Sequence, residues 1–292
     1  MPARSAVLWL THVWGPELQA EFETLSSGCG SDPPDVWLLA DSRTPGVTAL
    51  TRRYRRCYVF DEAVLLSLPY PKLDGRGILE HPHFSILEFF LSHPEYEYYW
   101  VIEYDVRYTG TWDTLLGAFR PFDHDLVTSH IRRFDQEPQW LWWDTLHHPS
   151  TRIARENYVR SFNVIYRISK RALAFMHDAQ LSGWQGHPEV SFPTLLCRAG
   201  FTLLDFGGSG EFTLPAFKNK YYTSRGSRSG TLSVFGTMRY RPSRVKAGMR
   251  KNMLYHPVKP APLIEPPSVR RGVVKRWVVE RMRDAVARGG CA

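Results

Sequence analysis

The sequence predicts an α/β fold in which a mostly parallel sheet is layered with helices. Short apolar runs of strand length alternate with apolar residues at helical spacing as far as residue 206. The chain has 292 residues, of which 43% are hydrophobic and 14% aromatic. It is therefore long enough and apolar enough to bury a large core.

The N-terminal part contains four predicted strands and one predicted helix. The runs "AVLWLTHVW", "DVWLLAD" and "CYVFDEA" are each followed by polar or turn residues, as is typical of strands. In "HPHFSILEFFLSH" the apolar side chains recur at helical spacing until His93 and Pro94 end the helix. The fourth strand, "YYWVIEYDV", is expected to carry Glu103 and Asp105 on one face, with Tyr104 facing away.

The next hundred residues continue the alternation. "DHDLVTSHI" indicates another strand, and residues 160–179 pass from a strand into a helix that begins near Ser169. A further helix is predicted from about Glu189 to Arg198, before a strand that ends at Asp205. In sheets of this kind, ligands bind at the carboxyl ends of the strands.

The last quarter of the chain differs in composition. Residues 1–217 carry 19 Lys and Arg against 26 Asp and Glu, whereas residues 218–292 carry 18 against 3. We expect one domain over 1–262, in which 218–250, rich in Gly, Ser and Arg, forms a flexible lid or loop. A Pro-rich linker and a basic amphipathic helix are predicted over 263–292. This helix either docks on the domain or lies on an anionic surface.

The pair Glu103 and Asp105 at the end of a hydrophobic strand indicates a cation site. Two carboxylates at strand spacing repel each other by roughly 2 to 3 kcal/mol at an effective dielectric constant near 20, and a divalent cation reverses that sign. Mg²⁺ and Mn²⁺ take carboxylates and then phosphate oxygens as ligands, which makes such a pair an anchor for a diphosphate. The alternative is that both residues are solvated at a strand end.

The stretch "WVIEYDVRYTGTW" resembles the DxD region of GT-A type glycosyltransferases, in which a hydrophobic strand runs into an acidic pair that holds the metal and the nucleotide-sugar. It is also similar to poorly characterised glycosyltransferase-like proteins with a DVR(Y/F)TGxW signature. The resemblance covers roughly residues 5–260 and implies a GT-A-like, Rossmann-like mixed sheet. Glu103 departs from the Asp of the family pattern, so the role of Asp105 is the better defined of the two.

Two more segments resemble the same family in the same order. "GWQGHPEVSFPTLL" resembles the region whose carboxylate deprotonates the acceptor in inverting enzymes, which implies that Glu189 is the catalytic base. Stabilisation of a helix N-terminus is the alternative role for Glu189, and Asp144, Asp205 and Glu211 are substitute bases. In "NMLYHPVK", His256 resembles the C-terminal histidine that completes the metal shell.

The resemblance implies a nucleoside-diphosphate-sugar donor bound through Mn²⁺ or Mg²⁺ on Asp105, Glu103 and His256. His12 and Asp41, at the ends of the first two strands, lie where this fold contacts the base and ribose, although both also suit strand-terminal turns. Arginines of the 218–250 segment are expected to close on the diphosphate: Arg225, Arg228, Arg239 and Arg241. The tryptophans of "PQWLWWDTLHHP" (Trp140, Trp142 and Trp143) form either a platform for an acceptor sugar or core packing.

The resemblance therefore implies an inverting hexosyltransferase-like enzyme that acts on a saccharide or lipid-linked acceptor, as in the synthesis of a surface polysaccharide or glycolipid. Metal-dependent nucleotidyl or phosphoryl transfer is the alternative reaction, although no GxxxxGK[ST] loop is present. A non-catalytic role through the basic tail, at a membrane or on nucleic acid, is the alternative class. We expect a cytoplasmic protein with peripheral contact to the inner face of the membrane through 268–288, and no nucleic-acid partner.

Overall fold

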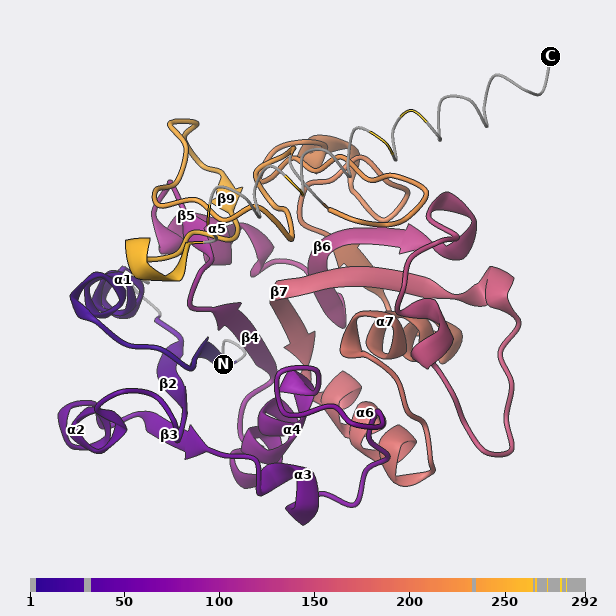
Figure 1. Ribbon diagram of the computed structural model, residues 1–292, viewed down its shortest axis with the longest axis horizontal. Helices are drawn as coiled ribbons and strands as arrows, with labels where there is room; N and C mark the ends of the chain where they lie inside the picture. Colours follow the sequence, from indigo (N-terminus) through magenta and orange to yellow (C-terminus); the bar gives the residue numbers. More distant parts are fainter. Residues whose placement is uncertain are drawn as a thin grey trace.

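The computed structural model describes residues 4–28, 33–232 and 235–264, together with residues 266, 272, 279 and 282. A seven-stranded sheet crosses the described part of the molecule in the order β3-β2-β1-β4-β7-β6-β8 (Figure 1). Its strands are β1 (Ser5–Thr11), β2 (Asp35–Asp41), β3 (Cys57–Phe60), β4 (Tyr98–Glu103), β6 (Leu126–Arg133), β7 (Val159–Ser169) and β8 (Leu203–Asp205).

The sheet is mixed but mostly parallel. Strands β1, β2, β3 and β4 pair in parallel with one another, and β8 pairs in parallel with β6. Only β7 runs against its neighbours β4 and β6 among the described strands. This arrangement confirms the predicted α/β, Rossmann-like fold class.

Helices cover both faces of the sheet. The α-helices are α1 (Pro16–Ser27), α2 (Val47–Arg53), α3 (Val64–Ser67), α4 (Pro82–Ser92), α5 (Trp112–Phe119), α6 (Lys170–Leu181) and α7 (Pro188–Arg198). Short 3₁₀ turns are η1 (Phe134–Gln136), η2 (Trp143–Thr145), η3 (Arg155–Asn157), η4 (Pro215–Phe217) and η5 (Ala261–Leu263).

Alternation along β1 divides the core into two layers. Ala6 and Leu8 pack on the side of α4, α6 and α7, whereas Val7 and Trp9 pack on the side of α1 and α5. Successive side chains of a strand point to opposite faces, so each apolar residue of this strand contributes to one of the two layers.

Local chemistry explains where several elements begin. The hydroxyl of Ser169 accepts a hydrogen bond from the N–H of Ala172 and caps α6, as the sequence predicts. Thr111 caps α5 in the same way through the N–H of Thr114. The expected helix at Glu189 begins one residue earlier, at Pro188, because proline suits the first turn of a helix.

One predicted strand is shorter than expected. β4 ends at Glu103, and the N–H of Val106 donates to the carbonyl of Glu103 at 3.0 Å, which turns the chain. Asp105 therefore lies in a turn and not on the strand. Tyr104, which was expected to face away, contacts the ring of His12 with 5.0 Å between the ring centroids.

A second, two-stranded sheet joins distant parts of the chain. β5 (Arg107–Tyr108) pairs antiparallel with β9 (Leu254–Tyr255). Thr109 continues this contact, since its N–H donates to the carbonyl of Met253 at 3.0 Å. The residues that follow β4 are thereby held against the residues around 255.

The 218–250 segment contains no helix or strand in its described part, in agreement with the predicted loop. It is anchored at several points. The hydroxyl of Tyr222 donates to both carboxylate oxygens of Asp205, and the N–H of Thr237 donates to the carbonyl of Thr223 at 2.8 Å. Figure 1 shows this orange segment at the same end of the molecule as β5 and β9. Motion of the segment as a lid stays a prediction.

The predicted C-terminal helix, with its expected membrane contact through 268–288, lies almost entirely outside the described residues. Within the described part of the chain, every helix is too short or too polar to cross a membrane.

Candidate metal centre

The turn after β4 is fixed by main-chain contacts and by one arginine. The N–H of Tyr104 donates to the carbonyl of Leu10 on β1 at 2.9 Å. The guanidinium of Arg107, which is 9% exposed, donates to the carbonyls of Tyr104 (2.6 Å) and Val106 (2.9 Å). The backbone that carries Asp105 is therefore held from both sides.

The β5–β9 pair brings His256 to this turn. The N–H of Val258 donates to the backbone carbonyl of Asp105 at 2.8 Å, directly joining the two segments. The imidazole Nδ1 of His256 donates to the carbonyl of Arg239 at 2.7 Å. In the neutral ring this contact leaves the lone pair on Nε2, the nitrogen that faces the carboxylates.

Glu103, Asp105 and His256 form a compact triad. The Nε2 atom of His256 lies 3.3 Å from Oδ1 of Asp105 and 3.9 Å from Oε2 of Glu103. One ligand atom from each residue lies within 4.8 Å of the other two. The structure thus brings together the three residues that the sequence predicts as metal ligands.

The charges of the triad shift its pKa values in opposite directions. Desolvation, and then the charge of Asp105, raise the pKa of Glu103 to about 7. Burial also acts to raise the pKa of Asp105, but His256 and Lys259 outweigh it, and the pKa is lowered. Burial acts to lower the pKa of His256, but the two carboxylates outweigh it and raise the pKa. The carboxylates of the cluster therefore favour a positive charge beside them.

The donor set fits a divalent cation. Oδ1 of Asp105 is buried and has no hydrogen-bond partner among the described residues, and such an atom needs a cation or a donor. Carboxylate oxygens suit both Mg²⁺ and Mn²⁺, and the added imidazole suits transition metals such as Mn²⁺ better than Mg²⁺.

A cleft with an empty volume of about 600 Å³ lies beside the triad, at the carboxyl ends of β1, β2 and β4. Its lining combines the polar residues Thr11, His12, Asp41, Ser85, Glu103 and Tyr104 with the apolar residues Leu10, Phe60, Ile78, Leu79 and Pro82. Glu103 belongs to both the cleft and the triad. A ligand in the cleft therefore reaches the candidate metal centre.

The two residues predicted to contact the nucleotide, His12 and Asp41, both line this cleft. Asp41 is also a structural residue, because Arg43 donates to Oδ1 from Nε at 2.9 Å and to Oδ2 from Nη2 at 2.7 Å. The side chain of Arg43 is 56% exposed. Desolvation lowers the pKa of His12, and the charge of Asp105 acts in the opposite direction.

Glu189 lies in the first turn of α7, and its side chain is only 14% exposed. The backbone N–H of Asn163 on β7 donates to its Oε1 at 3.2 Å. Burial raises the pKa of Glu189, while the charges of Arg160 and His256 act against this rise. The charge of Glu189 in turn raises the pKa of Glu103. Glu189 and the triad are therefore electrostatic neighbours.

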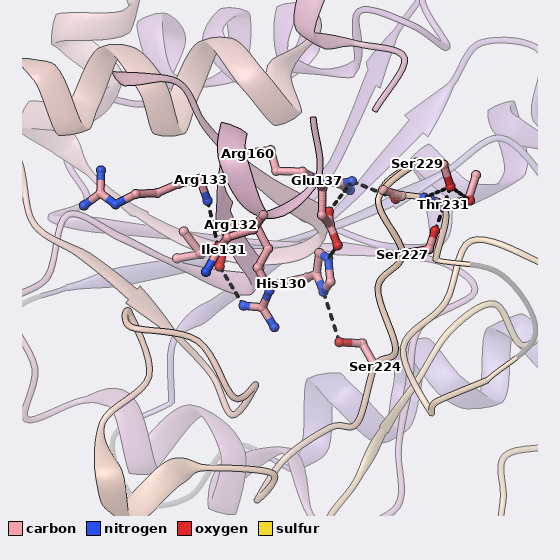
Figure 2. Close-up of polar contacts among 12 residues, drawn as sticks. His130, Ile131, Arg132, Arg133, Glu137, Arg160, Ser224, Ser227, Ser229 and Thr231 are labelled. Atoms are coloured by element: carbon pink, nitrogen blue, oxygen red, sulfur yellow. Dashed lines mark hydrogen bonds and ion pairs between the residues drawn. The ribbon is translucent and has the colours of Figure 1, made fainter. Parts of the chain in front are cut away.

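A buried polar network ties the 218–250 loop to β6 and β7 (Figure 2). The ring of His130 lies between Glu137 (Nε2 to Oε1, 2.9 Å) and Ser224 (Nδ1 to Oγ, 3.0 Å). Arg160 donates from Nη1 to Oε2 of Glu137 at 3.1 Å and to the carbonyl of Gly230 at 2.7 Å. Through Arg160, this network also borders Glu189.

The arginines predicted to close on a diphosphate occupy different environments. Arg225 and Arg228 are exposed. The guanidinium of Arg225 lies 5.6 Å from the ring centroid of Phe235, and the carbonyl of Arg228 accepts from the N–H of Gln139 at 2.9 Å. Arg239 is buried, and its N–H donates to the carbonyl of His256 at 3.1 Å. Contact of Arg225 or Arg228 with a diphosphate stays a prediction.

The tryptophan cluster is packing. Trp140 and Trp143 are buried with 5% and 1% exposure. Trp142 is half-buried, but His187 stacks on its ring at 4.3 Å between centroids, and the guanidinium of Arg76 lies 5.8 Å from the centroid. Trp140 and Trp143 are therefore part of the core, and one face of Trp142 is occupied by His187.

The three substitute bases have structural partners. Asp144 pairs with Arg155, and Glu211 pairs with Arg133 at 2.7 Å. Asp205 is fully buried under the hydroxyl of Tyr222 and the N–H of Gly208 (2.9 Å to Oδ1).

Sequence reasoning missed the positioning role of Arg107 and the proximity of Lys259 to Asp105. Arg107 belongs to the DVR signature, but the signature does not indicate what this residue does. Lys259 follows His256 by three positions, and only the β5–β9 pairing shows that its Nζ lies 3.5 Å from Oδ2 of Asp105.

A family model described as a protein of unknown function (DUF3405) matches residues 49–125. The matched segment runs from α2 to the residue before β6 and includes the turn that carries Glu103 and Asp105. It covers well under half of the chain. No curated protein matches the sequence.

Proposed function

We propose that this chain is a metal-dependent glycosyltransferase of the GT-A type, which moves a sugar from a nucleoside-diphosphate-sugar to a hydroxyl acceptor with inversion. The observation that carries the proposal is the convergence of Glu103, Asp105 and His256 beside the cleft. These residues come from segments about 150 positions apart, and Nε2 of His256 lies 3.3 Å from Asp105. The resemblance of "WVIEYDVRYTGTW" to the DxD region points to Glu103 and Asp105, and the resemblance of "NMLYHPVK" points to His256.

Asp105, Glu103 and His256 would hold Mn²⁺ or Mg²⁺. When bound, the cation supplies neutralisation of the charge on the departing nucleoside diphosphate, worth several kcal/mol. The chain's own residues orient the donor: His12 and Asp41 line the cleft, and Glu103 belongs both to the cleft and to the triad. We assign the nucleoside to the former and the diphosphate to the latter.

Glu189 is the proposed base. Its Oε1 accepts from the N–H of Asn163, which orients the carboxylate and leaves Oε2 for the acceptor hydroxyl. Burial raises its pKa above the usual value of a glutamate, as suits a residue that accepts a proton. A base opposite the leaving group gives inversion of configuration.

The first test is a thermal-shift screen of nucleoside diphosphates and their sugars, with and without Mn²⁺. We expect at least one of them to raise Tm only when Mn²⁺ is present, and Asp105→Asn to abolish the effect. A sugar-free nucleoside triphosphate that stabilises more strongly would favour nucleotidyl or phosphoryl transfer. The absence of any nucleotide response would refute the proposal.

The second test separates the base from the metal centre. We expect Glu189→Gln to keep the metal-dependent thermal shift and to lower turnover by 10²- to 10⁴-fold. Glu211→Gln, at an exposed carboxylate, is the matched control and should keep full turnover. A Glu189→Gln variant with normal turnover would remove this residue from the mechanism.

We also propose an acceptor class, a cellular location and the absence of a nucleic-acid partner. The acceptor is a saccharide or a lipid-linked sugar, and the protein acts in the cytoplasm with peripheral membrane contact through 268–288. No nucleic acid takes part.

A further inference from the structure

The ammonium group of Lys259 adds a positive charge to the candidate metal centre. Its Nζ lies 3.5 Å from Oδ2 of Asp105, on the carboxylate whose other oxygen faces His256. The Lys259 side chain is 27% exposed, whereas that of Asp105 is 4% exposed. The mechanism proposed above assigns no role to this ammonium group.

Two backbone hydrogen bonds, one from Lys259 and one from the residue before it, hold this segment in place. The N–H of Lys259 donates to the carbonyl of Arg244 at 2.8 Å, and the N–H of the preceding Val258 donates to the carbonyl of Asp105 at 2.8 Å. Only the side chain of Lys259 is free to change its partner. The segment that positions His256 in the triad therefore also positions the ammonium group of Lys259 there.

The ammonium group also borders the cleft. It lies 6.0 Å from the ring centroid of Tyr104, and its charge contributes to the lowered pKa of His12, after the larger effect of burial. Tyr104 and His12 both line the cleft together with Glu103. An anion that extends from the cleft to the triad must pass close to Lys259.

A divalent cation and the Lys259 ammonium group compete for the same carboxylate. Two positive charges on one carboxylate repel each other, so an ammonium group near Oδ2 weakens the binding of a cation at Oδ1. A lysine is also a strong binder of phosphate oxygens, as a compact charge on a flexible stem. Transfer of the ammonium group from Asp105 to a phosphate would remove the competition.

We propose that Lys259 couples the two ligands of the site: its ammonium group occupies Asp105 until a diphosphate enters, and then moves to the diphosphate and leaves the carboxylate to the metal. This inference rests on the proposed function. Because coupling between two ligands is reciprocal, the metal strengthens diphosphate binding by the same factor. The enzyme thereby acquires its metal together with its donor.

The test compares Lys259→Met with Lys259→Arg, which keeps the charge, and with Lys218→Met, which removes an exposed lysine elsewhere. Mn²⁺ alone is titrated and its free concentration is followed by electron paramagnetic resonance. Binding of inorganic pyrophosphate is measured by calorimetry at saturating Mg²⁺. We expect Lys259→Met to bind Mn²⁺ alone about tenfold more tightly and pyrophosphate about tenfold more weakly, a change of one decade in each constant. The two other variants should resemble the wild type, and all should unfold cooperatively.

The outcomes separate this inference from the proposed function. If Lys259→Met equals the wild type in both titrations while Asp105→Asn loses Mn²⁺ binding, the coupling is wrong and the metal centre stands. If Lys259→Met binds both ligands more weakly, Lys259 is a packing residue and the coupling is again wrong. If the wild type binds Mn²⁺ no better than Asp105→Asn, both proposals fail.

Discussion

Asp105 owes its position to hydrogen bonds that hold the backbone of the turn in which it lies. Arg107 is the main donor, since its guanidinium donates to the carbonyls of Tyr104 and Val106 within the turn. It also pairs with Glu21 on α1 at 3.1 Å. The side chain that fixes this turn is therefore also tied to α1.

We predict that Arg107→Met weakens Mn²⁺ binding about tenfold and lowers the free energy of unfolding by about 2 kcal/mol, because two buried carbonyls lose their donor. Arg107→Lys should also weaken Mn²⁺ binding, since one ammonium group cannot keep the two Nη1 contacts and the Nε contact with Glu21 at once. Calorimetry measures the affinity for Mn²⁺, and urea unfolding measures the free energy of unfolding. Arg152→Met, at an exposed arginine, is the control. Unchanged Mn²⁺ affinity in Arg107→Met would show that the turn holds without this residue.

We expect the buried carboxyl group of Glu137 to make the stability of the fold depend on pH. Burial acts to raise its pKa, but His130 and Arg160 outweigh burial and lower the pKa to about 2. A carboxyl whose folded pKa lies below its unfolded value stabilises the fold above the unfolded pKa, near 4.5. That contribution, about 3 kcal/mol at most, is lost as the pH falls from about 4.5 to about 2.

We predict that Glu137→Gln lowers the free energy of unfolding at pH 7 by about 3 kcal/mol, because Arg160 loses its buried partner. The variant should also lose less stability than the wild type between pH 4.5 and pH 2. Urea unfolding at several pH values measures both effects. Glu211→Gln removes a partly exposed pair and should cost less than about 1 kcal/mol. Parallel acid profiles for Glu137→Gln and the wild type would contradict the assignment.

At the scale of elements, the shortest strands have the largest effect on the site. β5 and β9 contain two residues each, and together with the hydrogen bond from Val258 to Asp105 they bring the segment of His256 and Lys259 to the end of β4. The hydroxyl of Thr109 fastens this pair, because it donates to the carbonyl of Arg250 at 2.6 Å and accepts from the N–H of Met253 at 3.0 Å.

We predict that Thr109→Val, which keeps the shape but removes the hydroxyl, lowers the free energy of unfolding by about 2 kcal/mol. It should also weaken Mn²⁺ binding several-fold, because His256 is then less firmly positioned. Thr109→Ser keeps the hydroxyl and should restore most of both properties. Urea unfolding and Mn²⁺ calorimetry measure the series. Full Mn²⁺ affinity in Thr109→Val would show that the pairing of β5 and β9 does not depend on the hydroxyl.

These elements also show what the sequence can predict. The long strands and the helices at 82–92 and 170–181 have strong periodic patterns, and the patterns predict them correctly. Two-residue strands have no period, so neither β5 nor β9 was predictable. Asp105 and His256 were predictable as candidate ligands from the resemblance to a family pattern, whereas the contact of Lys259 with Asp105 depends on a pairing between segments about 150 residues apart. The turn at 103–106 was missed because the hydrophobic strand pattern continues up to it.

At the scale of the whole molecule, charge is divided along the chain. The core clusters are built from residues between Ala6 and Val258, within the acidic part and the start of the basic part. Residues 268–292 carry seven Lys and Arg against two Asp and Glu, a balance that favours contact with an anionic surface. Folding and surface binding are therefore expected to belong to separate regions.

We predict that deletion of residues 268–292 leaves Tm within a few degrees of the wild type and abolishes binding to vesicles of anionic lipid. Each basic residue near such a surface contributes about 1 kcal/mol, and this attraction is screened by salt. Co-sedimentation with anionic vesicles at low and high salt measures the binding, with neutral vesicles as the control. Full-length protein should bind at low salt and release at high salt. Loss of cooperative unfolding in the truncated chain would show instead that the tail docks on the domain and stabilises it.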